Sequence, residues 1–98
     1  MKKDLQNIQQ KLRELIPYIT QKYNVSSLKI FGSFVRNEQN SRSDVDILVS
    51  FSKVPSLLKF IDLKNYLSDQ LQIKVDLVMN DSLKPRLRNN IINESVSI

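Results

Sequence analysis

The sequence predicts an α+β fold, in which helices pack on a small mixed sheet of three to four strands, within a single domain over residues 1–98. Three observations support this prediction. Apolar residues recur at helical spacing near the start of the chain, three short segments alternate like strands, and a second helical segment separates the last two of them. A chain of 98 residues can bury one modest core.

A helix is predicted first, because apolar residues keep helical spacing in this region. They are Leu5, Ile8, Leu12, Leu15, Ile16, Ile19 and Tyr23. Proline lacks a backbone N–H and its ring clashes with the preceding turn, so Pro17 should kink or split this helix. A strand follows over residues 28–31, and residues 33–37 can form one helical turn that brings Arg36 onto the same face as Ser33.

The second strand is predicted over residues 45–51, after a polar loop over residues 38–43. Its alternation places Val45, Ile47, Val49 and Phe51 on one face, opposite Asp44 and Asp46. The pair Pro55-Ser56 then starts a second helix. The buried stripe predicted for this helix consists of Leu57, Phe60, Ile61, Leu67 and Leu71.

A third strand is predicted over residues 73–79, with Asp76 on the face opposite its apolar residues. The last segment, residues 82–96, reads as an amphipathic helix. Pro85 is compatible with this helix only in its first turn. The tyrosines Tyr18, Tyr23 and Tyr66 have helical spacings that indicate packing.

Topology brings the polar residues of these segments together. The strand, helix, strand unit over residues 45–79 should make its two strands parallel with a right-handed crossover, while the short link before it favours an antiparallel neighbour. The end of the first strand and the beginnings of the second and third then share one edge of the sheet. The residues expected at this edge are Gly32, Ser33, Asp44, Asp46 and Asp76.

Composition excludes several kinds of chemistry. With no cysteine and no histidine, the chain has no disulfide, no thiolate zinc site, no cysteine nucleophile and no imidazole base. Carboxylates must therefore carry any acid–base or metal chemistry. No apolar run approaches the roughly 18 residues of a membrane span, and the start of the chain turns polar, so the expected location is the cytoplasm.

The net charge of +5 is dispersed along the chain. It fits ordinary solvated faces best, and a mild attraction to nucleotides, RNA or an acidic partner second. Direct binding of nucleic acid is possible on this reading but is the less favoured interpretation, and no membrane contact is expected.

The residues at the shared edge suit phosphate chemistry. A glycine lets backbone approach a ligand, a serine at a helix start offers a hydroxyl and an N–H, and carboxylates at i and i+2 project from the same side of a strand. Two unit charges 4 Å apart interact by roughly 4 kcal/mol at an effective dielectric of 20, so three gathered carboxylates need a cation. Mg²⁺ is the natural one, because it takes oxygen ligands and phosphates complete its shell.

The motif Gly32-Ser33-x10-Asp44-x-Asp46 resembles that of the minimal nucleotidyltransferases of the DNA polymerase beta superfamily. Arg36 inside the motif and Asp76, within Lys74-Val75-Asp76-Leu77-Val78, extend the resemblance, which covers residues 28–79. Two departures are Asn37, where the family often has glycine, and Phe34, where many members have a polar or small residue.

The resemblance implies a polymerase-beta-like core that binds ATP and two Mg²⁺ ions. Asp44, Asp46 and Asp76 would be both metal ligands and catalytic residues, with Asp76 a bridging ligand or a base. The nucleotide-binding residues would be Gly32, Ser33, Arg36 and Ser43, the last of which also orders the turn before Asp44. Small members are usually antitoxins paired with a HEPN-domain ribonuclease toxin, and some transfer AMP from ATP to a tyrosine of that toxin.

Each motif also has a plainer interpretation. Asp-x-Asp alone is often a surface loop or capping pair, and Asp76 could be an edge-strand charge that discourages aggregation. Arg36 could form a structural ion pair with Glu38 or with an aspartate at the sheet edge. The rival function is a binding module: a non-catalytic antitoxin, or a nucleotide or RNA binder, that inhibits its partner by contact. Its surface would use Arg86, Arg88 and the apolar positions of the last segment.

Overall fold

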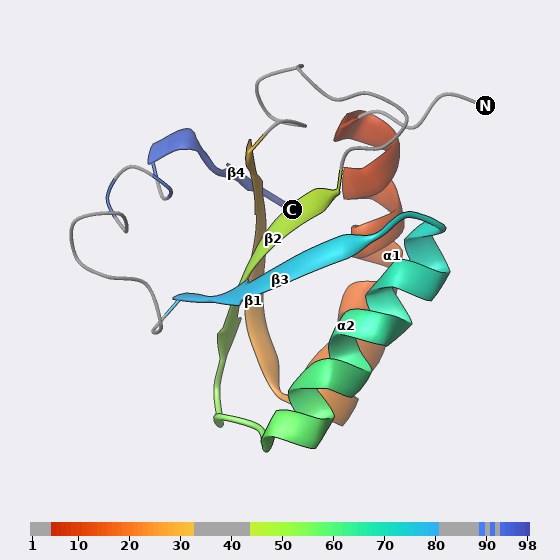
Figure 1. The fold of residues 1–98 in the computed structure, drawn as a ribbon, viewed down its shortest axis with the longest axis vertical. Coiled ribbons are helices and arrows are strands. Elements are labelled where there is room, and N and C mark those ends of the chain that lie inside the picture. Colours follow the sequence, from red (N-terminus) through yellow and green to blue (C-terminus); the bar gives the residue numbers. More distant parts are fainter. Residues whose placement is uncertain (1–4, 33–43, 81–88, 90, 92) are drawn as a thin grey trace.

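The computed structural model describes residues 5–32, 44–80, 89, 91 and 93–98. Its elements, in chain order, are α1 (Leu5–Tyr23), β1 (Val25–Phe31), β2 (Val45–Phe51), α2 (Leu57–Leu71), β3 (Val75–Met79) and β4 (Val96–Ser97) (Figure 1). The predicted α+β class with a small sheet is confirmed. Neither α1 nor α2 is long and apolar enough to cross a membrane.

The sheet is mixed and its strands lie in the order β3-β2-β1-β4. β1 is antiparallel to β2 and to β4, whereas β2 and β3 run parallel and are connected through α2. The predicted directions of the three main strands are therefore correct. The parallel pair needs a crossover connection, and the chain supplies it as a 15-residue helix.

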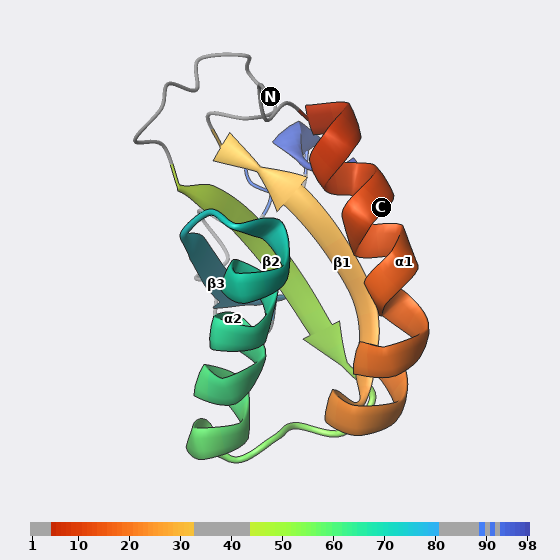
Figure 2. The same ribbon diagram turned by 90° about the vertical axis from the view of Figure 1, so that its right-hand side faces the viewer.

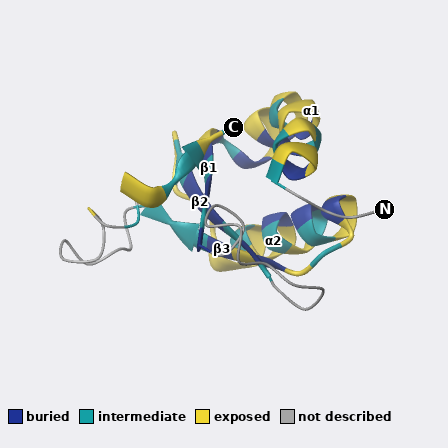
Figure 3. Cartoon of the chain, turned by 90° about the horizontal axis from the view of Figure 1, so that it is seen from above, coloured by how far each residue is buried: buried dark blue, intermediate teal, exposed yellow. Residues whose placement is uncertain are grey.

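Both helices pack against the same face of the sheet (Figures 2 and 3). Alternation in β2 directs Val45, Ile47 and Val49 into the core between the helices and the sheet, and each is fully buried. The opposite face, called the outer face below, carries the alternate residues of each strand. They are Ser27, Lys29, Phe31, Asp46, Leu48, Ser50, Asp76 and Val78, and Asn80 follows on the same face just after β3.

Helix α1 runs without a break past Pro17, so the predicted split does not occur. Arg13, whose carbonyl would normally accept from residue 17, is exposed, as is Pro17 itself. Water can therefore satisfy the carbonyl that proline leaves without a donor. The core stripe of the helix matches the prediction at Ile8, Leu12 and Ile19.

Helix α2 begins where the sequence predicts, because the Ser56 hydroxyl accepts from the backbone N–H of Lys59. Its predicted buried stripe is wrong in part, since Leu57 is 73% exposed and Ile61 is 43% exposed. Leu63, which the prediction omitted, is fully buried. At about 100° per residue, positions 61 and 63 lie about 200° apart, so burying one exposes the other.

Three tyrosines join the two helices. Tyr18, Tyr23 and Tyr66 have ring centroids 5.0 to 6.5 Å apart, which confirms the packing role predicted for them. The Tyr23 hydroxyl also donates to Asp62 Oδ2 at 2.6 Å. Burial and this hydrogen bond raise the pKa of Tyr23 to about 12.

The end of the chain differs from the prediction. Val96, placed in the last helix by its spacing, begins the two-residue strand β4, and Val96 pairs with Ile30 of β1. Helical residues precede this strand at 89, 91 and 93–94, while residues 81–88, with Pro85, Arg86 and Arg88, lie outside the described residues. β4 thus covers part of the edge of β1 that a three-strand sheet would leave open.

Candidate functional site

Strand register places two of the predicted aspartates side by side. Asp46 of β2 pairs with Phe31 of β1 on one side and with Asp76 of β3 on the other. Paired residues of neighbouring strands point to the same face, so both carboxylates lie on the outer face, next to the end of β1. The predicted convergence of the three strand ends is therefore present in the described residues.

Asp44 lies two residues before Asp46 and projects from the same side of the chain. Its side chain is 40% exposed, and Asp44 Oδ2 lies 4.0 Å from Lys74 Nζ. The Val45 N–H donates to the Lys74 carbonyl at 2.9 Å, which fixes this stretch beside the entry to β3. Lys74 was not among the predicted site residues, although its alternation with Asp76 places both on one face.

Gly32 ends β1 in a conformation that favours glycine. Its φ is +81°, a region that side-chain-bearing residues rarely adopt, and the residue is buried. A Cβ built on Gly32 would collide with Asp46 Oδ2. The absence of a side chain at Gly32 therefore lets backbone pass directly against the Asp46 carboxylate.

The donors at this edge suit a hard cation. Asp44, Asp46 and Asp76 offer only carboxylate oxygens, the ligands that Mg²⁺ prefers, and the Lys74 ammonium already lies beside one of them. Among the described residues, no three acidic side chains are drawn close enough to hold a metal ion.

Several predicted residues lie outside the described part of the chain. They are Ser33, Arg36 and Ser43, together with Phe34, Asn37 and Glu38. Their roles remain predictions from the sequence. Gly32, Asp44, Asp46 and Asp76 are the predicted site residues that the structure places.

Comparison with known proteins identifies the family of this chain. The sequence model of the family described as polymerase beta, nucleotidyltransferase, matches residues 13–98. A Thermococcus cleftensis relative named protein adenylyltransferase MntA is 45% identical over 80 residues, which cover 82% of this chain and 81% of the relative.

Solved structures show the same fold. One described as a candidate minimal nucleotidyltransferase has a TM-score of 0.82 and 31% identity, covering 98% of this chain and 97% of that one. A second contains a tri-AMPylated HEPN toxin of Shewanella oneidensis in complex with an MNT antitoxin. The matched chain of that complex has a TM-score of 0.68 and 20% identity, covering 92% of this chain and 70% of its own length.

Proposed function

Because the chain belongs to the polymerase beta nucleotidyltransferase family, we propose that it is a Mg²⁺-dependent protein adenylyltransferase that acts as an antitoxin. It joins AMP from ATP to a tyrosine hydroxyl on a HEPN-domain toxin. In the reaction the acceptor oxygen forms a bond to the α-phosphorus of ATP, the α–β phosphoanhydride bond breaks, and pyrophosphate leaves. The acceptor hydroxyl loses its proton in the same exchange.

The observation that carries this proposal is the register of Asp46. It lies between the end of β1 and Asp76, and its carboxylate abuts the backbone of Gly32. A triphosphate that approaches the Gly32 backbone would therefore meet carboxylates on two neighbouring strands. That combination fits a phosphate held through metal ions better than it fits a surface loop or an isolated edge-strand charge.

The chain's own residues divide the work. Asp44 and Asp46 would hold the cations that bind the triphosphate, and Asp76 would complete the set or accept the proton of the acceptor hydroxyl. Bound Mg²⁺ supplies charge that stabilises the phosphoryl oxygens and makes the hydroxyl easier to ionise. Gly32 lets the phosphate come close to the backbone. The Lys74 ammonium lies beside the Asp44 carboxylate and can respond to changes in its charge.

Support for a HEPN partner comes from relatives. The Thermococcus cleftensis relative is named a protein adenylyltransferase, and the Shewanella oneidensis antitoxin is bound to a HEPN toxin that carries AMP groups. Asp46 and Asp76 lie on the outer face, while the helices cover the other face (Figure 2). A folded partner can therefore bring its hydroxyl to the carboxylates without disturbing the core.

A labelling experiment tests the proposal. The HEPN-domain protein encoded beside this chain is incubated with it, Mg²⁺ and ATP labelled at either the α- or the γ-phosphate. We expect label from the α-phosphate alone on the partner, lost with Asp46→Asn and retained with Asp69→Asn. Asp69, an exposed aspartate of α2, provides a control with the same chemical change away from the site.

The rival mechanism predicts a different result. A contact inhibitor would silence the toxin without labelling it, and would do so equally well with Asp46→Asn. Neutralisation that survives this substitution, with no label on the partner, would overturn the proposed activity.

A further inference from the structure

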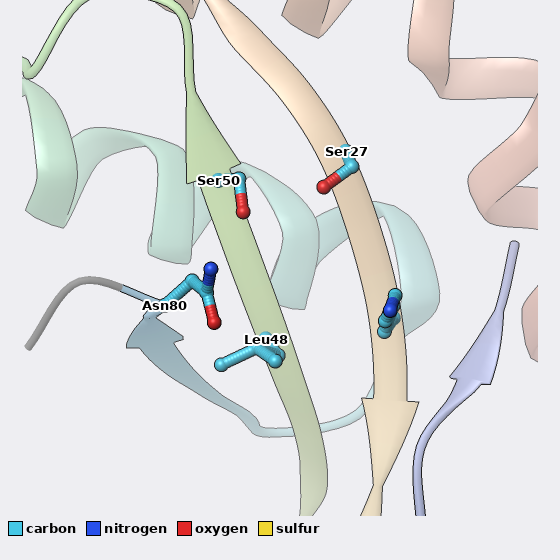
Figure 4. Close-up of a pocket in the computed structure, with 5 residues that line it drawn as sticks. Ser27, Leu48, Ser50 and Asn80 are labelled. Carbon is cyan, nitrogen blue, oxygen red and sulfur yellow. The ribbon is translucent and has the colours of Figure 1, made fainter. Parts of the chain in front are cut away.

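A polar pocket lies on the outer face, further along the sheet than the aspartates. It has a volume of about 150 Å³ and is lined by Ser27 and Lys29 of β1, Leu48 and Ser50 of β2, and Asn80 after β3 (Figure 4). Three neighbouring strands therefore contribute to it. Leu48 is only 4% exposed although it lies on the outer face, so it forms an apolar floor beneath the polar lining.

The pocket is lined by a carboxamide, an ammonium group and two hydroxyls. Asn80 Oδ1 is buried and has no hydrogen-bond partner among the residues that the structure describes, which is uncommon for a buried polar atom. The described lining includes the Lys29 ammonium and two serine hydroxyls but no carboxylate. Because a carboxamide carries both an acceptor and an N–H₂ donor, Asn80 can serve a ligand in either orientation.

The pocket's chemistry favours an anionic group. Lys29 supplies a positive charge, while Ser27, Ser50 and Asn80 can donate to the same oxygens. Hydrogen bonds from a charged donor to an anion are about twice as strong as neutral ones. A neutral ligand would leave the Lys29 charge without a counter-ion in a pocket whose described lining has none.

The position of the pocket relates it to the aspartates. Leu48 and Ser50 are two and four residues beyond Asp46 on β2, or roughly 7 and 13 Å at about 3.3 Å per residue. An extended polypeptide advances by nearly the same distance per residue. Its side chains also alternate, so residues two or four positions from the acceptor would face the sheet on the same side.

We propose that this pocket is a subsite for an anionic group of the acceptor protein, located two or four residues along an extended segment from the hydroxyl that receives AMP. The inference rests on the proposed adenylyl transfer to a protein. The anion is either an acidic side chain of the acceptor or the phosphate of an AMP already attached to it. In both cases the pocket fixes which hydroxyl reaches the carboxylates and contributes nothing to the binding of ATP.

Kinetics of transfer to the neighbouring HEPN-domain protein test the subsite. Lys29→Met should raise the KM for the acceptor by roughly ten- to one-hundred-fold, the loss expected for one charged hydrogen bond, with the KM for ATP unchanged. Asn80→Asp, nearly isosteric but anionic, should act in the same direction. Lys53→Met removes an equal charge from an exposed position outside the pocket and should leave both constants unchanged.

The anion can be identified by asking whether the pocket variants affect the first AMP transfer or only the later ones. An effect already present on the unmodified acceptor indicates an acidic side chain, and one that begins with the second transfer indicates the attached phosphate. Unchanged acceptor KM for every transfer with both pocket variants would overturn the subsite, even though AMP transfer itself continued.

A binding measurement separates this inference from the proposed function. In an isotope-labelled sample, inorganic phosphate should shift the side-chain amide resonance of Asn80, and Lys29→Met should abolish that shift. This readout needs no turnover, so a chain that fails to transfer AMP could still give it. If phosphate leaves the Asn80 resonance unmoved, the pocket is not an anion subsite.

Discussion

Replacing Gly32 by alanine would separate two demands on this position. The first is conformational, because an alanine at φ +81° costs about 1–2 kcal/mol. The second is steric, because the new Cβ would occupy the space of Asp46 Oδ2. A carboxylate can rotate away from a methyl group, so the fold should survive while the Asp46 side chain is displaced.

The two demands predict losses of different size. Stability should fall by about 1–2 kcal/mol in urea unfolding, which leaves most molecules of a typical domain folded. A misplacement of about 1 Å at a reacting centre can cost roughly one-hundred-fold in rate, equivalent to about 2.7 kcal/mol. The rate of AMP transfer by Gly32→Ala should therefore fall about one-hundred-fold, measured with saturating partner under conditions where the variant is folded.

A double-mutant cycle tests whether the loss acts through Asp46. Once Asp46→Asn has removed the carboxylate function, adding Gly32→Ala should lower stability but reduce the residual activity little further. Full transfer activity in Gly32→Ala would refute the reasoning. So would losses of activity that simply multiply in the double variant, because Gly32 would then act independently of Asp46.

Three further predictions test the fold. The raised pKa of Tyr23, from 10.0 to about 12, means that the folded state keeps a proton that the unfolded state loses, so stability should fall by roughly 2 kcal/mol between pH 10 and 12. Tyr23→Phe should remove this part of the pH dependence of urea unfolding. Gln72 caps α2 at φ +55°, so replacing it by glycine should stabilise the protein by about 1 kcal/mol in thermal unfolding. A loss of stability would contradict the assigned cap. Leu58→Ser, at an 80% exposed position, should change the free energy of unfolding by no more than about 0.5 kcal/mol. Leu67→Ala, in the core, should lower it by about 2–5 kcal/mol. Similar costs for the two variants would mean that α2 buries a different face.

Much of the site could be predicted because it depends on local patterns and strand directions. Alternation in β2 is enough to place Asp44 and Asp46 opposite Val45 and Ile47. The length of each connection then selects parallel or antiparallel pairing, which brings Asp76 to the same edge. The Ser56 cap is equally local, since it needs only a hydroxyl before a helical run.

What could not be predicted depends on tertiary contacts. In α2, leucine and isoleucine occur on both sides of the helix, so spacing alone could not decide between Ile61 and Leu63 as the buried residue. A two-residue strand such as β4 has no periodicity of its own, and only its pairing with Ile30 reveals it. The contact of Gly32 with Asp46 and the approach of Lys74 to Asp44 require the register of three strands.

The most direct test of the central claim is the intact mass of the HEPN-domain partner after incubation with this chain, ATP and Mg²⁺. The account predicts a gain of one or more AMP groups with the wild-type chain and none when Mg²⁺ is chelated or when Asp76 is replaced by asparagine. Asp76 is the most exposed of the three aspartates, and it pairs with Asp46 on the neighbouring strand. An unchanged partner mass with the wild-type chain, or full AMP addition by Asp76→Asn, would contradict the account.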